Sequence, residues 1–462
     1  MTVIVEKPYQ FVPPHRGNLW PSFIQTFRLV DRYLARHDGV VDHECRHLQR
    51  LGDSLAAGDS ILLAPNHCRY ADPLVLGWPA RELRTHLYAM ASWHLFARSP
   101  LQAFAIQKMG GFSIFREGTD RQSLETAVEI LTTAERPLVL FPEGTTNRTN
   151  DVLQPLLDGV AFIARTAAKR RAKQSGGRVV IHPVAIKYLF LGDIHEWGDQ
   201  VASKLEERLG WRPTHHAPLL SRIARLAEAL LSIHEVRYLG KPTDQPLARR
   251  RDGLVEHLLS IAEAEFALPL DRSSGPLGRV RKLRSKLTAA LAACSAQQKE
   301  HFYHIIDAVE LSQQLYAFPD RYLFQFPTTD TQILETLERM EEALLGRVDN
   351  PGPLKAVIEF GEAIVVPQDR PPRGAADPLT AAIERPLSEM LGRLALEANR
   401  VETAASDGES PSDRSETDPW QPPPPPLGAA PDNRATTGQH FPGRSSVADP
   451  AIMTGETETK KP

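Results

Sequence analysis

The stretch "SILLAPNHCRYADPLVLG", residues 60–77, joins an apolar run to a polar turn and indicates how the chain folds. Its first part is continuously apolar, which is typical of a strand buried on both faces of a parallel sheet. The chain then presents His67 and, five positions later, Asp72 followed by Pro73, a favoured way to begin a helix. In one continuous helix His67 and Asp72 would lie about 140° apart, so they meet only if the chain turns between them. They are therefore either a base with its orienting carboxylate or a loop histidine beside a helix cap.

Two further apolar runs, at 137–144 and 178–188, have the same character as the first. Segments with helical periodicity separate the three runs, and strand–helix alternation is typical of an α/β sheet with its sites at the carboxyl ends of strands. We therefore expect an α/β fold with a mostly parallel central sheet flanked by helices. The expected helices span 73–81, 94–108, 119–135 and 154–173.

Beyond residue 195 the pattern becomes helical, and an apolar run at 354–366 then reads as a strand that returns to the first sheet. The final residues are poor in apolar side chains and contain five consecutive prolines, which is typical of disorder. The predicted organisation is a lead-in, a first part of the main domain, an all-helical insertion, a closing strand with its helix, and a disordered tail. These segments span 1–40, 41–195, 196–350, 351–401 and 402–462.

The bulk composition of the 462 residues excludes several classes of protein. A formal net charge of −3 gives no field that would attract nucleic acid, so we expect no nucleic-acid partner. Three scattered cysteines do not make a disulfide framework, which fits a reducing compartment. The chain shows neither a signal peptide nor the roughly 18–20 apolar residues of a spanning helix. We therefore expect a cytoplasmic protein whose contact with lipid is peripheral.

Two amphipathic segments allow a membrane interpretation beside a structural one. In residues 19–37 four apolar side chains recur at helical spacing, which predicts either a helix packed on the core or an interfacial helix carrying Trp20. In residues 278–293 one helical face is apolar and the first turns are rich in arginine and lysine. That segment is either a helix with a solvated basic face or a patch for anionic lipid head groups.

Three more motifs follow the same logic of polar residues placed after apolar runs. In "FPEGTTNRTND" (141–151) a strand delivers Glu143, a glycine that permits a tight turn, and Arg148, whose guanidinium suits phosphate. In "MGGFSIFRE" (109–117) a short apolar segment ends in Arg116, a second candidate for phosphate. In "VVIHPVAIKY" (179–188) a proline interrupts an apolar strand, which predicts an edge or a bulge near a pocket.

Together, and in this order, the motifs resemble those of the glycerolipid acyltransferase family, which contains 1-acylglycerol-3-phosphate and glycerol-3-phosphate acyltransferases. The family pattern N-H-x-x-x-x-D is matched by Asn66, His67 and Asp72, and F-P-E-G-T is matched by residues 141–145. The glycine-containing segment that ends in arginine is matched by 111–116, and the apolar strand with proline by the residues around 183. The resemblance covers about 41–195 and 351–400.

The resemblance implies transfer of a fatty acyl group from acyl-CoA or acyl carrier protein to a hydroxyl of a glycerol-phosphate or lysophospholipid acceptor. His67 would act as general base and Asp72 would orient it, as a carboxylate does in a Ser-His-Asp triad. Backbone amides around Gly144 would hold the oxyanion. No cofactor and no metal are required, and the enzyme would contact the inner face of the membrane peripherally. The implied substrate-binding residues are Asn66, Arg116, Glu143, Gly144, Thr145 and Arg148.

Two departures from the family pattern and four alternatives remain open. Arg69 stands where many members have serine, which adds a positive charge beside the base, and Thr146-Asn147 replaces the common Arg-Ser. The chain could instead be a non-catalytic lipid- or acyl-binding module, or an acyl-thioester hydrolase. Cys68 beside the motif histidine raises a cysteine–histidine nucleophile. A metal site on a strand is a further alternative, for which a fourth ligand is lacking; its ligands would be His43, Cys45 and His47.

Overall fold

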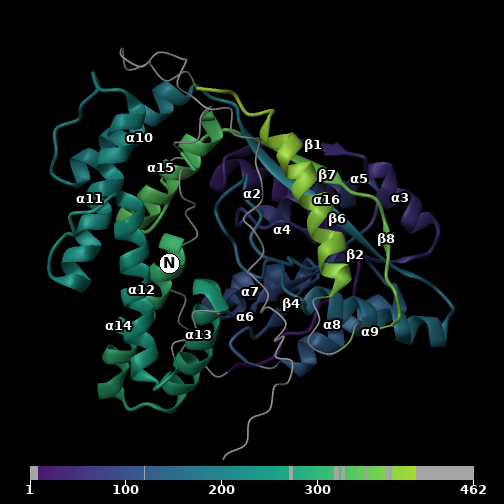
Figure 1. Ribbon diagram of the computed structural model, residues 1–462. Helices are drawn as coiled ribbons and strands as arrows, with labels where there is room; N and C mark the ends of the chain where they lie inside the picture. Colours follow the sequence, from purple (N-terminus) through teal and green to yellow (C-terminus); the bar gives the residue numbers. More distant parts are fainter. Residues whose placement is uncertain are drawn as a thin grey trace, which may run out of the picture. The chain divides into compact units, whose positions relative to one another are not determined.

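The computed structural model describes residues 9–118, 120–269, 274–316, 322–323, 328–349, 351–369, 372 and 377–401 (Figure 1). These residues all belong to one compact unit. The predicted disordered tail, 402–462, lies outside the described residues. Within the described part of the chain, no helix is long and apolar enough to cross a membrane.

A mixed, mostly parallel sheet forms the centre of the fold and confirms the predicted α/β class. Its order is β1-β7-β6-β2-β5-β3-β4, with β8 paired to β6. All neighbours are parallel except β6–β7 and β6–β8, which are antiparallel. The strands are β1 (Val40–Arg46), β2 (Ser60–Pro65), β3 (Tyr88–Ser92), β4 (Gly111–Ile114), β5 (Leu138–Val139), β6 (Val179–Phe190), β7 (Leu354–Phe360) and β8 (Ile364–Val365).

Strand β2 is buried on both faces, as its continuous apolar sequence predicts. Ile61 and Leu63 belong to one core cluster, and Leu62 and Ala64 belong to the other. Helices α8, α9 and α16 cover the second cluster, and Figure 1 shows α16 lying across the sheet. The helices outside the insertion are α1 (Leu19–Thr26), α2 (Leu29–His37), α3 (Leu48–Ala56), α4 (Asp72–Val75), α5 (Gly77–Glu82), α6 (Trp93–Arg98), α7 (Pro100–Lys108), α8 (Arg121–Thr133), α9 (Gly159–Gln174) and α16 (Pro378–Ala395).

The described residues between β6 and β7 form helices and no strand. Helices α10, α11 and α15 contribute to the core on the first face of the sheet, whereas α12, α13 and α14 share a cluster of their own. Strand β7 then pairs with β1 and β6, so the chain returns to the first sheet. The five segment boundaries stay predictions. The six helices are α10 (Ile194–Arg208), α11 (Leu219–Leu239), α12 (Leu247–Glu265), α13 (Gly275–Ala293), α14 (Ala296–Tyr316) and α15 (Asp330–Leu345).

Register places two loops side by side at one edge of the sheet. Strand β2 pairs with β5 through Leu62–Leu138 and Leu63–Val139, in parallel. Because parallel strands end at the same edge, the segment after Pro65 and the segment after Leu140 emerge together. The sheet thereby joins the histidine motif to the F-P-E-G-T motif.

Several local expectations were wrong for identifiable reasons. The helix expected over 19–37 is two helices, because Arg28 adopts a left-handed backbone with φ 50°. The strand expected at 137–144 pairs only at Leu138–Val139, since the chain leaves the ladder towards Pro142 and the turn at Gly144. Pro183 lies inside the sheet, neither at an edge nor at a bulge, because the register of β6 with β2 runs through it without a shift. It falls between the part of β6 that pairs with β8 and the part that pairs with β7. The missing N–H of proline therefore removes no hydrogen bond between strands at this position.

Candidate active site

The turn after β2 folds His67 onto Asp72. The imidazole Nδ1 lies 2.8 Å from Asp72 Oδ2, and Asp72 is fully buried. Asp72 does not cap helix α4: it is the first helical residue, and the N-cap is Ala71. Its carboxylate also accepts hydrogen bonds from the Arg69 main-chain N–H at 2.9 Å and from the Tyr188 hydroxyl at 2.7 Å. The arrangement is therefore a histidine–carboxylate pair held by further donors, not a loop histidine beside a cap.

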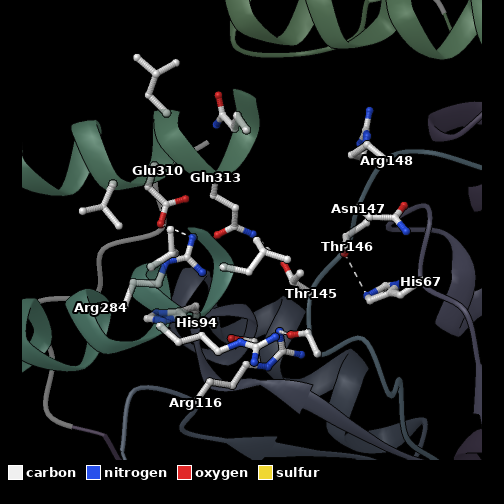
Figure 2. A pocket seen from close by; sticks show the side chains of 18 of the residues that line it. His67, His94, Arg116, Thr145, Thr146, Asn147, Arg148, Arg284, Glu310 and Gln313 are labelled. Carbon is white, nitrogen blue, oxygen red and sulfur yellow. Dashed lines mark hydrogen bonds and ion pairs between the residues drawn. The ribbon is translucent and has the colours of Figure 1, made fainter. Parts of the chain in front are cut away.

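The second imidazole nitrogen of His67 faces a cavity (Figure 2). Because a carboxylate can only accept, Nδ1 carries the proton towards Asp72 and Nε2 is left with its lone pair. Nε2 lies 3.0 Å from the Thr146 hydroxyl, drawn as a dashed line in Figure 2. The ring stacks on Phe141 with centroids 4.1 Å apart, which fixes its plane. The imidazole is thus oriented to accept a proton from a hydroxyl in the cavity.

Glu143 clamps the two loops together. Its Oε1 accepts a hydrogen bond from the His67 main-chain N–H at 2.6 Å. Its Oε2 accepts from the Asn147 amide at 2.7 Å and from the Gln154 main-chain N–H at 2.9 Å. Burial raises the pKa of Glu143 to about 8, although all three donors act in the opposite direction. Both oxygens are occupied by the protein, so Glu143 positions the histidine loop.

Asn66 also holds the loop rather than facing the cavity. Its side chain donates to the Ile186 carbonyl at 3.0 Å and accepts from the Ile186 N–H at 2.7 Å, which anchors the end of β2 to β6. Neither Asn66 nor Glu143 lines the cavity, and both are buried. The expected direct contact of these two residues with substrate is therefore not what the structure shows.

The cavity has a volume of about 1960 Å³ and is lined by five of the predicted site residues; Asp72 lies buried behind His67 and does not reach it. That exceeds the roughly 300–1,000 Å³ of an ordinary small-molecule pocket. Arg116 donates from Nη1 to the Gly144 carbonyl at 2.5 Å. Gly144 has φ +71°, and a Cβ there would stand 2.4 Å from Leu157 Cδ1, so the turn requires glycine. The predicted residues on the cavity are His67, Arg116, Gly144, Thr145 and Arg148.

Residues 45–187 match the family model described as Acyltransferase. This segment belongs to the glycerolipid acyltransferase domain family. The match contains the His67–Asp72 pair, Arg116 and the loop after β5, and it ends within β6. A comparison with proteins of curated function gives no match to the chain.

Within this segment the unusual Arg69 is not a free charge beside the histidine. Its guanidinium forms a 2.7 Å ion pair with Glu338 of helix α15 and lies over the Tyr188 ring, 5.4 Å from the centroid. Arg148 is likewise paired, to Glu342 of the same helix at 2.8 Å. Helix α15 therefore neutralises both arginines, and no feature of the local sequence pointed to it.

Cys68 does not support the nucleophile alternative. Its side chain is fully buried and is absent from the cavity wall. Its sulfur lies 3.8 Å from Asp72 Oδ1, and burial raises the pKa of the thiol well above its usual value. A thiolate, which is the nucleophilic form, is therefore disfavoured at this position.

The metal alternative also finds no support. His43 stacks on Trp78 with centroids 4.2 Å apart, and burial raises the pKa of Cys45 to about 12. His47 adopts φ 55° at the start of α3, beyond the end of β1. Among the described residues, no group of three histidine, cysteine, aspartate or glutamate side chains is close enough to hold a metal ion.

Proposed function

We propose that the protein transfers a fatty acyl group from acyl-CoA or acyl carrier protein to a hydroxyl of a glycerol-phosphate or lysophospholipid acceptor. The observation that supports this most is the His67–Asp72 pair, whose free nitrogen Nε2 faces a large cavity. A site that only bound lipid would have no need of a buried carboxylate oriented on a cavity histidine. The Acyltransferase match over the same residues agrees with this chemistry.

In the proposed reaction, the acceptor hydroxyl takes the place now occupied by the Thr146 hydroxyl at Nε2. His67 removes the proton as the oxygen attacks the thioester carbonyl, and Asp72 stabilises the imidazolium that forms. The tetrahedral intermediate collapses, the C–S bond breaks, and His67 returns the proton to the departing thiolate. No acyl-enzyme is formed, because the substrate supplies the nucleophile.

The developing oxyanion needs main-chain donors near this position. The Gly144 N–H, which the sequence suggested, already donates to the Phe141 carbonyl at 3.1 Å and does not serve. Among the described residues, nothing accepts a hydrogen bond from the N–H of Thr145 or Thr146. We assign the oxyanion site to these two amides.

Arg116 is the stronger candidate for the acceptor's phosphate. No described carboxylate pairs with its guanidinium, which lines the cavity beside Gly144. Arg148 already has Glu342 as a partner, so it would contact a phosphate only by sharing or leaving that carboxylate. A planar guanidinium without a counter-ion is the better partner for a phosphate group.

We further propose that a patch on the N-terminal helices brings the enzyme to the inner face of the membrane. We define the aromatic patch as Leu19, Trp20, Phe23, Phe27, Leu101 and Phe104, all of them exposed. The Trp20 ring contacts Phe104 edge-on at 5.4 Å, so α1 and α7 present one continuous apolar surface. Such a surface with tryptophan is typical of interfacial binding.

Vesicle co-sedimentation tests the patch. Trp20→Ala/Phe23→Ala should lower the partition coefficient on phospholipid vesicles about tenfold or more, because each ring loses apolar area buried in lipid. Leu396→Ala removes a 74 % exposed apolar side chain outside the patch and should leave partitioning unchanged. Equal effects of the two changes would contradict a specific membrane-binding surface.

An acyl-CoA turnover assay with and without acceptors tests the proposed reaction. Labelled acyl-CoA or acyl carrier protein is offered with glycerol 3-phosphate or lysophospholipids, and both labelled lipid and free thiol are measured. We expect thiol release that depends on the acceptor and equals the lipid formed. Thiol release without an acceptor would identify a hydrolase, and no turnover with either donor would identify a binding module.

A further inference from the structure

The cavity has two apolar walls that come from different parts of the chain. One belongs to the acyltransferase segment and its flanking helix and includes Met90, Ile114, Leu140 and Ile163. The other belongs to the helical insertion and includes Leu230, Leu231, Leu287 and Val309, from helices α11, α13 and α14. One long hydrocarbon chain requires one apolar wall. Two walls from separate parts of the protein provide room for two hydrocarbon chains.

Helix α13 carries cations next to its part of the apolar wall. Arg281 and Arg284 line the cavity one turn apart, and Leu287 and Leu291 follow on the cavity one to two turns later. At 1.5 Å per residue, these leucines lie about 5–10 Å along the helix from Arg284. A ligand that follows α13 therefore meets positive charge and then hydrocarbon within a short distance.

Neither cation is fully engaged by the described residues. Arg284 pairs with Glu310 of α14, as Figure 2 shows, but its Nε is buried and donates to no described acceptor. Arg281 has no ion-pair partner among the described carboxylates. Burial lowers the pKa of Arg116, and the charges of Arg284 and Arg281 lower it further, whereas Glu117, which also lines the cavity, acts in the opposite direction. Three guanidinium groups against the carboxylates of Glu310 and Glu117 leave an excess of positive charge at this part of the cavity, which favours an anion.

The short separation of charge and hydrocarbon discriminates between the two substrates. In a monoacyl glycerol phosphate, the phosphate is a few bonds from the acyl ester, and the free hydroxyl lies between them. In acyl-CoA, the long pantetheine arm separates the phosphates from the thioester and its chain. Only the first molecule can place its anion at Arg284 and its chain against Leu287 at the same time.

We propose that α13 and its neighbours form the acceptor site and that the acceptor is a monoacyl glycerol phosphate. Its phosphate is bound by Arg281 and Arg284 together with Arg116, and its acyl chain lies between α11, α13 and α14. The inference rests on the proposed acyl transfer and narrows it, because glycerol 3-phosphate has no chain for the insertion to hold. The helical insertion is then the part of the chain that selects the acceptor.

Equilibrium binding to the full-length His67→Ala protein tests the head-group site without any turnover. The probe is oleoyl lysophosphatidate below its micelle concentration. Arg281→Gln/Arg284→Gln should raise its dissociation constant about ten- to a hundredfold, because charge-assisted hydrogen bonds are lost. The double change leaves Glu310 without its partner Arg284. Adding Glu310→Gln removes this carboxylate and should not restore binding. Lys286→Gln, a change of the same type on α13 away from the cavity, should leave the constant within about twofold.

The proposed site of the acyl chain is tested by filling it with a larger side chain. Ala227 of α11 lines the cavity, and Ala229 on the same helix does not. Ala227→Phe should raise the dissociation constant for the oleoyl probe about tenfold and leave that for a hexanoyl probe unchanged, because the short chain does not reach the ring. Ala229→Phe should change neither constant. Unfolding midpoints of all variants, compared with the parent, verify that each is folded.

The outcomes separate this inference from the proposed function. Preference for glycerol 3-phosphate over the oleoyl probe, or an equal effect of Ala227→Phe on both chain lengths, overturns the acceptor site. If Arg281→Gln/Arg284→Gln weakens the binding of acyl-CoA but not that of lysophosphatidate, the two arginines bind the donor. That result also overturns the acceptor site. Tight, chain-dependent binding without acyl transfer would leave the acceptor site standing and refute the proposed reaction.

Discussion

The buried ion pair between Arg69 and Glu338 joins the histidine loop to helix α15, and its removal measures that coupling. The Nη2–Oε2 distance is 2.7 Å, and the two side chains are 10 % and 3 % exposed. Glu338→Ala leaves a buried guanidinium without this carboxylate, a change that typically costs about 3–5 kcal/mol. Glu335 also acts on the charge of Arg69 and retains part of the stabilisation. We therefore expect a loss of about 3 kcal/mol in the free energy of unfolding.

Urea unfolding gives this free energy for the parent, for Glu338→Ala and for a surface control. The control is Glu129→Ala, which breaks a 2.9 Å pair with Arg16 whose side chains are 52 % and 47 % exposed. An exposed pair contributes about 0–1 kcal/mol, so the control should lose no more than that. Arg69→Met/Glu338→Leu removes both charges and should recover most of the loss of the single change.

If Glu338→Ala costs no more than Glu129→Ala, the buried pair does not form in solution and helix α15 does not restrain the histidine loop. If Arg69→Met/Glu338→Leu is less stable than Glu338→Ala, the loss comes from packing and not from an unpaired charge.

Three further predictions concern the site itself. Asp72→Asn should lower kcat by up to roughly 10⁴-fold, because the amide favours the wrong imidazole tautomer; steady-state kinetics measure this, and a loss under tenfold would contradict the pair. Burial raises the pKa of Glu143 to about 8, so the unfolded chain releases its proton first, and the free energy of unfolding falls as pH rises from about 4.5 to 8. Glu143→Gln should lack that component of the fall in urea unfolding at pH 5 and pH 8.5, and parallel pH profiles of parent and variant would contradict it. Gly144→Ala forces φ +71° on alanine and places Cβ 2.4 Å from Leu157 Cδ1, so thermal unfolding should show a loss above about 1–2 kcal/mol, and an unchanged midpoint would contradict the strained turn.

Much of the fold follows from the sequence because the central strands are apolar on both faces. The runs that became β2, β6 and β7 stand out for that reason. Strand β1, with the sequence "VVDHECR", is half polar and lies at the edge of the sheet, where no described strand pairs with its outer side. Its strand character depends on β7, more than 300 residues away, and the sequence suggested a strand here only within the metal alternative.

In the candidate site, too, some contacts could be predicted from the sequence and others could not. The pairing of His67 with Asp72 follows from their spacing and from a turn, which are local features. The contacts of Tyr188 with Asp72 and of Glu338 with Arg69 join residues far apart in the sequence, so no motif indicates them. Arg279 shows that a basic composition does not predict which cations are exposed. It belongs to the basic segment expected to be solvated or to bind lipid, yet it is buried, with its Nε 2.7 Å from Glu263 Oε1.

The proposed reaction depends on His67 as the base that activates the acceptor hydroxyl. The most direct test compares His67→Ala with the parent in transfer of a labelled acyl group from acyl-CoA or acyl carrier protein to a lysophospholipid. His215→Ala, a 63 % exposed histidine away from the cavity, is the matched control. We expect lipid product to fall at least about 10³-fold in His67→Ala and to stay within twofold in His215→Ala, with both proteins folded. Comparable product from His67→Ala and the parent would show that another group removes the proton and that His67 is not the base.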